Sequence, residues 1–300
     1  MNDYHDAVLL KESIKALNIN SSGIYVDVTF GGGGHSREIL NHLKTGTLIA
    51  FDQDGDSLKN VISTKKNFKM INCNFRNIEE SLMELGIDKI NGLIADLGVS
   101  SHQFSDNNRG FSIKYDAQID MRMDKRLLKT GRFIVNNYTK QDLNRILKEH
   151  SDFNKPGVIS DHIIHSRSAM PIETVFDLKR IFDGFIPMRY QNKFFARLFQ
   201  AIRIEVNDEV NALKDMLNQA KNLLDSSGRI VIISYHSVED KIVKNFMKYG
   251  NLNNNYQQDF FGNKINHFKL LTKKPIRPSE LELRKNHKSR SAKMRVCEKV

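Results

Sequence analysis

The sequence of 300 residues contains only two cysteines, five prolines and no tryptophan. Cys73 and Cys297 lie far apart in the chain, which excludes a disulfide framework and a cysteine-based zinc site. No run of about 18 apolar residues is present, so no segment has the composition of a membrane-spanning helix. Residues 1–7 are polar and acidic, unlike a secretory signal. We therefore expect a protein of the reducing cytoplasm that holds no metal ion.

Acidic residues are also scarce. The chain has 46 Lys and Arg residues against 35 Asp and Glu residues, a formal net charge of +11. The imbalance is strongest in residues 264–299, where only Glu280, Glu282 and Glu298 oppose a series of lysines and arginines. This asymmetry predicts a polyanionic partner such as nucleic acid, although a basic tail that faces solvent is the alternative.

What the chain does contain is a run of four glycines, Gly31, Gly32, Gly33 and Gly34. A β-branched and aromatic segment precedes them and a helical pattern follows, which is the start of a nucleotide-binding βαβ unit. A dinucleotide loop would have a third spaced glycine where Ser36 stands. An acid, Asp27, also precedes the glycines within the predicted strand. This pattern is closer to the S-adenosylmethionine (SAM) loop of Rossmann-like methyltransferases, and a merely tight turn is the alternative.

Short apolar segments alternate with helical patterns over the first hundred residues. The predicted strands are 24–30, 47–52, 68–74 and 90–97, and the predicted helices include 5–17, 57–66 and 78–85. This alternation predicts a parallel α/β sheet with helices on both faces. A fifth strand is predicted at 229–236, and a final antiparallel pair at 267–272 and 292–296.

Residues 106–206 have helical patterns and no clear strand. We therefore predict an inserted helical domain at 106–206 and a sheet domain formed by 1–105 and 207–300. On the helix predicted at 194–206, a polar stripe either reads bases and phosphates or faces solvent; it consists of Gln200, Arg203 and Asn207. Arg109 pairs either with an RNA phosphate or with Asp120.

Three side chains stand where ligands bind in open α/β sheets, at the carboxyl ends of predicted strands. Asp52 lies about twenty residues beyond the glycines, where a carboxylate accepts hydrogen bonds from ribose hydroxyls. A simple turn acid is the alternative. Phe75 could cover an adenine ring or pack in the core, and Asp96 ends the fourth strand.

Seven motifs then appear in order and carry a specific resemblance. They are residues 27–36 (DVTFGGGGHS), 96–103 (DLGVSSHQ), 109–112 (RGFS), 120–124 (DMRMD), 199–204 (FQAIRI), 233–240 (ISYHSVED) and 290–295 (RSAKMR). Together they resemble the bacterial 16S rRNA cytosine-N4 methyltransferases, also called the MraW family, from His5 to Arg295. Departures from the family pattern, such as His102 in place of proline, fall on the substrate side.

The resemblance implies a Rossmann-like class I SAM-dependent methyltransferase sheet with an inserted helical domain that helps to bind substrate. It also implies methylation of N4 of a cytidine in the decoding region of 16S rRNA, within the small ribosomal subunit. By resemblance, SAM is contacted by Gly33, Gly34 and His35, its ribose is held by Asp52, and its pocket is lined by Phe75, Asp96 and Gln103.

Asp96 is the first candidate for the group that accepts a proton from the cytosine amine, and a role in binding the cofactor alone is the competing interpretation. His236 is a second catalytic candidate, with a structural histidine as the alternative. Two other functions stay open at this point: an RNA-binding protein without turnover, and an NAD-dependent oxidoreductase.

Overall fold

The computed structural model describes residues 7–300, and the chain divides into two compact units. The sheet unit is formed by Met1–Gly98 and Val210–Val300, and the helical unit by Val99–Glu209. Every helix within residues 7–300 is too short or too polar to span a bilayer.

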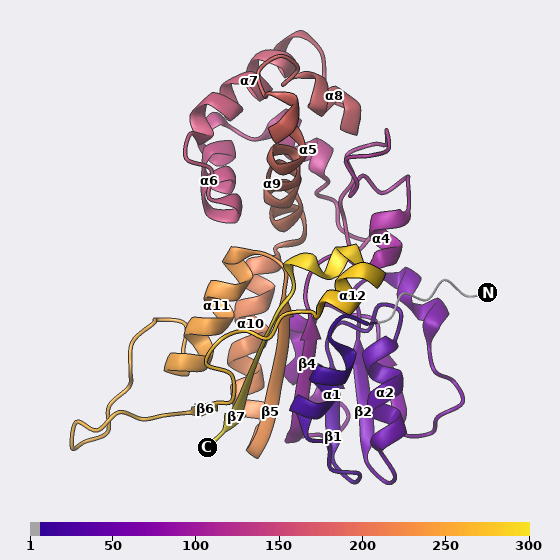
Figure 1. Cartoon of the computed structure of the whole chain (residues 1–300), viewed down its shortest axis with the longest axis vertical. Coiled ribbons are helices and arrows are strands. Elements are labelled where there is room, and N and C mark those ends of the chain that lie inside the picture. Colours follow the sequence, from indigo (N-terminus) through magenta and orange to yellow (C-terminus); the bar gives the residue numbers. More distant parts are fainter. Residues whose placement is uncertain (1–6) are drawn as a thin grey trace. The chain divides into compact units, whose positions relative to one another are not determined.

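The sheet unit contains one seven-stranded sheet in the order β3-β2-β1-β4-β5-β7-β6 (Figure 1). The first five strands in this order are parallel, whereas β7 is antiparallel to both β5 and β6. The strands are β1 Ile24–Asp27, β2 Thr47–Phe51, β3 Phe68–Ile71, β4 Ile90–Asp96, β5 Leu224–Ser234, β6 Phe268–Leu270 and β7 Lys293–Lys299. The predicted α/β sheet and its final antiparallel pair are confirmed.

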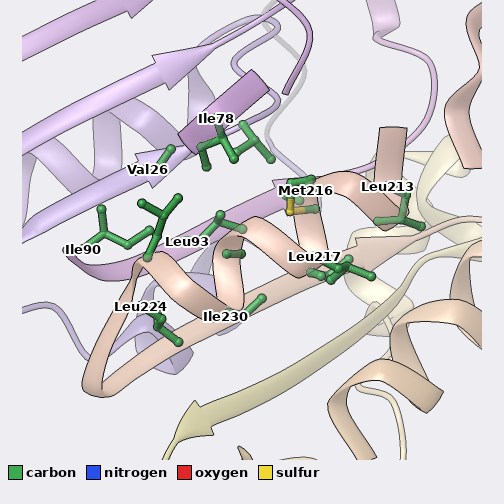
Figure 2. Close-up of a cluster of buried hydrophobic side chains, with 14 of the residues drawn as sticks. Val26, Ile78, Ile90, Leu93, Leu213, Met216, Leu217, Leu224 and Ile230 are labelled. Atoms are coloured by element: carbon green, nitrogen blue, oxygen red, sulfur yellow. The ribbon is translucent and has the colours of Figure 1, made fainter. Parts of the chain in front are cut away.

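Helices cover both faces of this sheet, because alternate residues of each strand point to opposite sides. On one face Val26, Leu93 and Ile230 pack with α3, α10 and α11; on the other, Tyr25 and Ile94 pack with α1 and α2. Figure 2 shows Met216 and Leu217 of α10 among the first set. The helices are α1 Leu10–Leu17, α2 Gly34–His42, α3 Ile78–Met83, α10 Glu209–Leu223, α11 Ser237–Tyr249 and α12 Glu280–Lys285.

Two helix predictions differ from the structure. The helix predicted at 57–66 is instead a 3-10 helix, Gly55–Asn60, whose start is capped when the Asp54 carboxylate accepts the Asp56 N–H. The β-branched residues that follow it, Val61, Ile62 and Thr64, lose side-chain freedom in a helix, and they lie in irregular structure and a turn. The helix predicted from His5 begins at Leu10, and His5 lies outside the described residues.

The helical unit has an apolar core of its own, built on α9, with α6 packed against both α7 and α9. Its helices are α4 Ser101–Ser105, α5 Gly131–Asn137, α6 Lys140–Ser151, α7 Pro156–Ala169, α8 Val175–Arg180 and α9 Met188–Asn207. Helix α4 begins at a capping box that Ser100 and Gln103 form.

The polar stripe of α9 is bonded within this unit, so neither interpretation from the sequence is correct. Gln200 donates to the His150 carbonyl at 2.7 Å, Arg203 pairs with Glu209 at 2.8 Å, and Asn207 donates to the Met121 carbonyl at 2.7 Å. These side chains fix α9 against its neighbours.

Arg109 is likewise part of the internal structure of the helical unit. It is 5% exposed, and its guanidinium donates to the carbonyls of Arg122 and Met123. Asp120 pairs with Arg122 at 2.7 Å, and the positive charge of Arg109 also favours its ionised form. Arg109 therefore supports the backbone of this segment.

Leu93 is the natural probe of the sheet core, since it is fully buried in the central strand β4. We expect Leu93→Ala to lower the free energy of unfolding by about 2–5 kcal/mol, because it leaves a cavity in a close-packed region. Urea denaturation followed by circular dichroism measures this change. Met83→Ala, at a side chain that is 64% exposed on α3, should stay within about 0.5 kcal/mol of the wild type.

Candidate active site at the carboxyl edge of the sheet

Parallel pairing brings three carboxylates to one edge of the sheet. Asp27 ends β1, Asp96 ends β4, and Asp52 directly follows β2. In register, Asp27 lies beside Ala50 of β2 and Ile94 of β4, so the three strand ends are adjacent. We call Asp27, Asp52 and Asp96 the acidic edge. From the sequence, the last two are predicted ligands, whereas Asp27 is predicted only as the strand acid that precedes a SAM loop.

The glycine loop after β1 adopts a backbone conformation that would be strained for residues other than glycine. Gly31 and Gly33 have φ angles of +51° and +76°, in the left-handed region that favours glycine. A Cβ on Gly33 would lie 2.9 Å from the ring of Phe30, and one on Gly34 would lie 2.8 Å from the Cβ of Ala7. Helix α2 begins at Gly34, so the loop ends in free N–H groups at a helix start.

Asp27 explains why the third spaced glycine is missing. Its buried carboxylate accepts a hydrogen bond from the Ser36 hydroxyl at 2.7 Å and one from the Thr29 N–H at 3.1 Å. Burial raises the pKa of Asp27 to about 6, although these two hydrogen bonds oppose the rise. Ser36 therefore binds a strand acid where a dinucleotide loop would have glycine, and this pair was the signal available in the sequence.

Asp52 holds the glycine loop in place. One carboxylate oxygen accepts the Gly31 N–H at 2.7 Å, and the other accepts the Asp54 N–H at 2.8 Å. Burial raises the pKa of Asp52 to about 6, and the charges of Asp54 and Asp27 add to that rise. Each carboxylate oxygen has two acceptor positions, so Asp52 can accept further hydrogen bonds from a ligand.

Asp96 is the most strongly perturbed of the three acids. Burial is the main reason that its pKa rises to about 7, and nearby negative charges on Asp27, Glu239 and Glu282 raise it further. The Tyr235 hydroxyl opposes this rise by donating to Asp96 Oδ1 at 2.7 Å. The Asp96 N–H donates to the Thr29 hydroxyl at 2.6 Å, which ties β4 to the end of β1.

His35 faces the second oxygen of Asp96, with 4.0 Å between Nδ1 and Oδ2. Its other ring nitrogen lies 3.1 Å from the Val8 carbonyl. Burial lowers the pKa of His35 to about 4, so the ring is neutral near pH 7 and does not neutralise Asp96.

Tyr235 is a site residue that sequence analysis missed, although it immediately precedes the candidate His236. Its N–H donates to Glu239 at 3.0 Å while its hydroxyl binds Asp96. His236 Nδ1 caps α11 by accepting the Glu239 N–H at 3.4 Å. His236 Nε2 is buried and lies 3.1 Å from Glu239 Oε1, outside hydrogen-bonding geometry.

The remaining predicted residues lie in two different settings. Phe75 opens a 3-10 helix after β3, is half-buried, and packs against the apolar core of the sheet unit. Gln103 belongs to the helical unit, is buried, and accepts the Ser100 N–H at 3.0 Å in the capping box of α4.

The charge of the acidic edge indicates what kind of ligand it fits. Within residues 7–300, none of its three carboxylates pairs with a lysine or an arginine, and the one histidine beside it is neutral. Buried carboxylates without countercharges are stabilised by ligands that bring positive charge or hydrogen-bond donors. The glycine loop, Asp52 and Asp96 therefore fit a ligand that carries hydroxyl groups and a cationic centre, as SAM does.

Comparison with known proteins agrees with this chemistry. The model of the MraW methylase family matches residues 2–300. Proteins named ribosomal RNA small subunit methyltransferase H are similar over 99% of this chain: 46% identical in Cytophaga hutchinsonii, covering 99% of that protein, and 47% identical in Amoebophilus asiaticus, covering 96%.

Among solved structures, an rRNA methylase from Streptococcus thermophilus is 11% identical, with 97% of this chain and 93% of that chain covered. Its TM-score is 0.43, which is too low to support an argument.

The raised pKa of Asp96 predicts a dependence of stability on pH. A carboxyl group with a higher pKa in the folded chain binds its proton more tightly there, so stability falls as pH rises between the two values. For Asp96 this window runs from the usual 3.8 to about 7. We therefore expect Asp96→Asn to be more stable than the wild type at pH 8, by roughly 1–3 kcal/mol, with the difference vanishing toward pH 4.

Urea denaturation at a series of pH values measures this difference, and Asp88→Asn is the matched control because Asp88 is exposed. The control should track the wild type at every pH. An Asp96→Asn variant that is less stable than the wild type at pH 8 would contradict the expectation.

Proposed function

The chain belongs to the MraW methylase family, and from this premise we propose that it transfers the methyl group of SAM to N4 of a cytidine in the decoding region of 16S rRNA. It is a SAM-dependent methyltransferase, and its relatives carry the name ribosomal RNA small subunit methyltransferase H. The observation that carries the proposal is the acidic edge beside the glycine loop.

SAM supplies a methyl group already activated by attachment to a sulfonium, so we expect the transfer to need no metal ion. Gly33, Gly34 and His35 would contact the cofactor at the start of α2. Asp52 would accept hydrogen bonds from the ribose hydroxyls while it keeps the Gly31 N–H in place. Phe75 would line the rest of the pocket, and the contact of Gln103 with the cofactor stays a prediction from the family resemblance.

Asp96 would accept the proton that the cytosine amine loses. The amine is a weak nucleophile because its lone pair is delocalised into the ring, and an acceptor beside its N–H localises that pair. A pKa of about 7 suits the task, since the group can take up and release a proton near neutral pH. Tyr235 would fix the orientation of Asp96 by donating to one oxygen, which leaves the other for the substrate.

His236 remains the second catalytic candidate. Its Nδ1 is engaged in capping α11, and its Nε2 is buried beside Glu239. We propose that it positions Glu239, which in turn accepts the N–H of Tyr235.

The rRNA would be bound through basic side chains and the helical unit, in the cytoplasm where small subunits assemble. Lys293 and Arg295 are paired with Asp240. Many other basic side chains of residues 264–290 are exposed and can contact phosphates; these include Lys269, Lys273, Lys274, Arg277, Arg284 and Arg290. The target cytidine must leave its stack to reach the acidic edge.

The direct test uses small ribosomal subunits from cells that lack this protein, mixed with purified protein and methyl-labelled SAM. After digestion of the rRNA, we expect mass spectrometry to identify the labelled nucleoside as N4-methylcytidine. Subunits from cells that contain the protein should take up little label, because their site is already modified. Intact SAM binding without label would mean that the substrate is a different one.

Asp96→Asn tests the role of the proton acceptor. We expect turnover to fall on the order of a hundredfold or more, since general-base catalysis is lost. The affinity for SAM, measured by calorimetry, should fall far less than turnover, because Asp52 and the glycine loop still bind the cofactor and the hydrogen bond from Tyr235 is kept. If SAM binding is lost instead, Asp96 serves the cofactor, and its proposed role in proton transfer is wrong. Asp88→Asn again controls for the change of charge.

A further inference from the structure

The loop between α11 and β6, residues 250–267, carries the two most exposed aromatic side chains among residues 7–300. Phe260 is 98% exposed and Phe261 is 84% exposed, whereas the next phenylalanine, Phe133, is 47% exposed. Figure 1 shows this loop extending away from α11 and β6. Burial of an apolar ring is favourable, so two adjacent exposed rings indicate a surface that a partner covers.

The tip that carries these rings is held by a local hydrogen-bond network. Asp259 Oδ1 accepts the N–H groups of Phe261 and Asn263, at 2.9 and 2.8 Å. An isolated β-bridge joins Gln258 to Lys264 below the tip, and the Ile265 N–H donates to the Gln257 carbonyl at 2.9 Å. The two phenyl rings lie 5.7 Å apart and nearly perpendicular. The tip therefore presents both rings in a fixed arrangement.

Positive charge and aromatic faces surround the base of the loop. The Lys264 ammonium lies 4.7 Å from the centre of the Tyr256 ring, and the Lys248 ammonium lies 4.5 Å from that of Tyr249. The two tyrosine rings contact each other edge to face at 4.9 Å. The only acid of the loop, Asp259, is engaged by backbone N–H groups and by Asn263, which lower its pKa. The remaining polar side chains are mainly amides of Asn and Gln.

We propose that residues 250–267 form an RNA-binding finger in which Phe260 and Phe261 stack on unpaired bases. Lys264 of the finger and Lys248 at the end of α11 contact the phosphates beside these bases. Exposed aromatic rings next to lysines are the means by which proteins bind single-stranded RNA, because every base has a face on which a ring can stack. An apolar pocket on a protein would also accept two phenylalanines, but a rim of lysines and amides suits a polyanion better. The proposal rests on the proposed function for the identity of the RNA.

The test compares three double variants of the full-length protein in which Phe260 and Phe261 are both replaced by Ala, by Leu or by Trp. Stacking needs a flat ring, so we expect Ala and Leu to weaken binding to unmethylated small subunits on the order of tenfold or more, and Trp to keep it within about threefold. The affinity for SAM and the melting temperature should stay unchanged, because the tip contributes no side chain to the core. Met83→Ala controls for the loss of an exposed apolar side chain.

Two outcomes overturn the proposal. If the Ala variant binds subunits as the wild type does, the rings make no contact. If Leu restores binding, they enter an apolar protein pocket and do not stack on bases. The same variants are also measured on an unstructured RNA oligonucleotide, where only an RNA contact can produce a difference. Failure of the proposed function would appear separately, as a wild-type protein that binds RNA but yields no N4-methylcytidine.

Discussion

The alignment of β1, β2 and β4 is the constraint on which the rest of the candidate site depends. Parallel pairing places the carboxyl ends of these strands at one edge, so Asp27, Asp52 and Asp96 meet there although they are distant in sequence. Burial is the main reason that the pKa of each acid rises to about 6 or 7, and the charge of Asp27 adds to the rise at Asp52 and Asp96. The glycine loop opposes the rise at Asp52, because the Gly31 N–H donates a hydrogen bond to this carboxylate and lowers its pKa.

Charge is distributed unevenly in the sheet unit. The chain is strongly basic, with a formal net charge of +11, yet no lysine or arginine within residues 7–300 pairs with the acidic edge. Lys293 and Arg295, on the strand next to β5, are held instead by Asp240 of α11. A cationic sulfonium and a polyanionic RNA need opposite surroundings, and this arrangement provides both within one unit.

The parts of the fold and of the candidate site that could be predicted are those that depend on residues close together in the sequence. The strands around Val26, Leu93 and Ile230 were evident from apolar runs, and Asp52 and Asp96 from their places after those runs. The hydrogen bond from Ser36 to Asp27 was not predicted, although the two residues that form it stand in one motif of the sequence. Tyr235 was missed because its bond to Asp96 spans 139 residues of sequence. The polar stripe on α9 was misinterpreted because helical spacing does not reveal which partners a polar face meets.

Two features of the sheet unit are unfavourable for the chain without ligands, and each indicates the kind of ligand that would stabilise it. The acidic edge holds carboxylates with no countercharge, and the tip of residues 250–267 exposes two phenyl rings. Neither improves packing, and both depart from the rule that charges are solvated and large apolar groups are covered. Since such departures concentrate at functional sites, they support our proposals that the first is the place of a cationic cofactor and the second the place of stacked bases. The rigid strand ends would then position the chemistry, while the loop would add affinity for substrate without disturbing it.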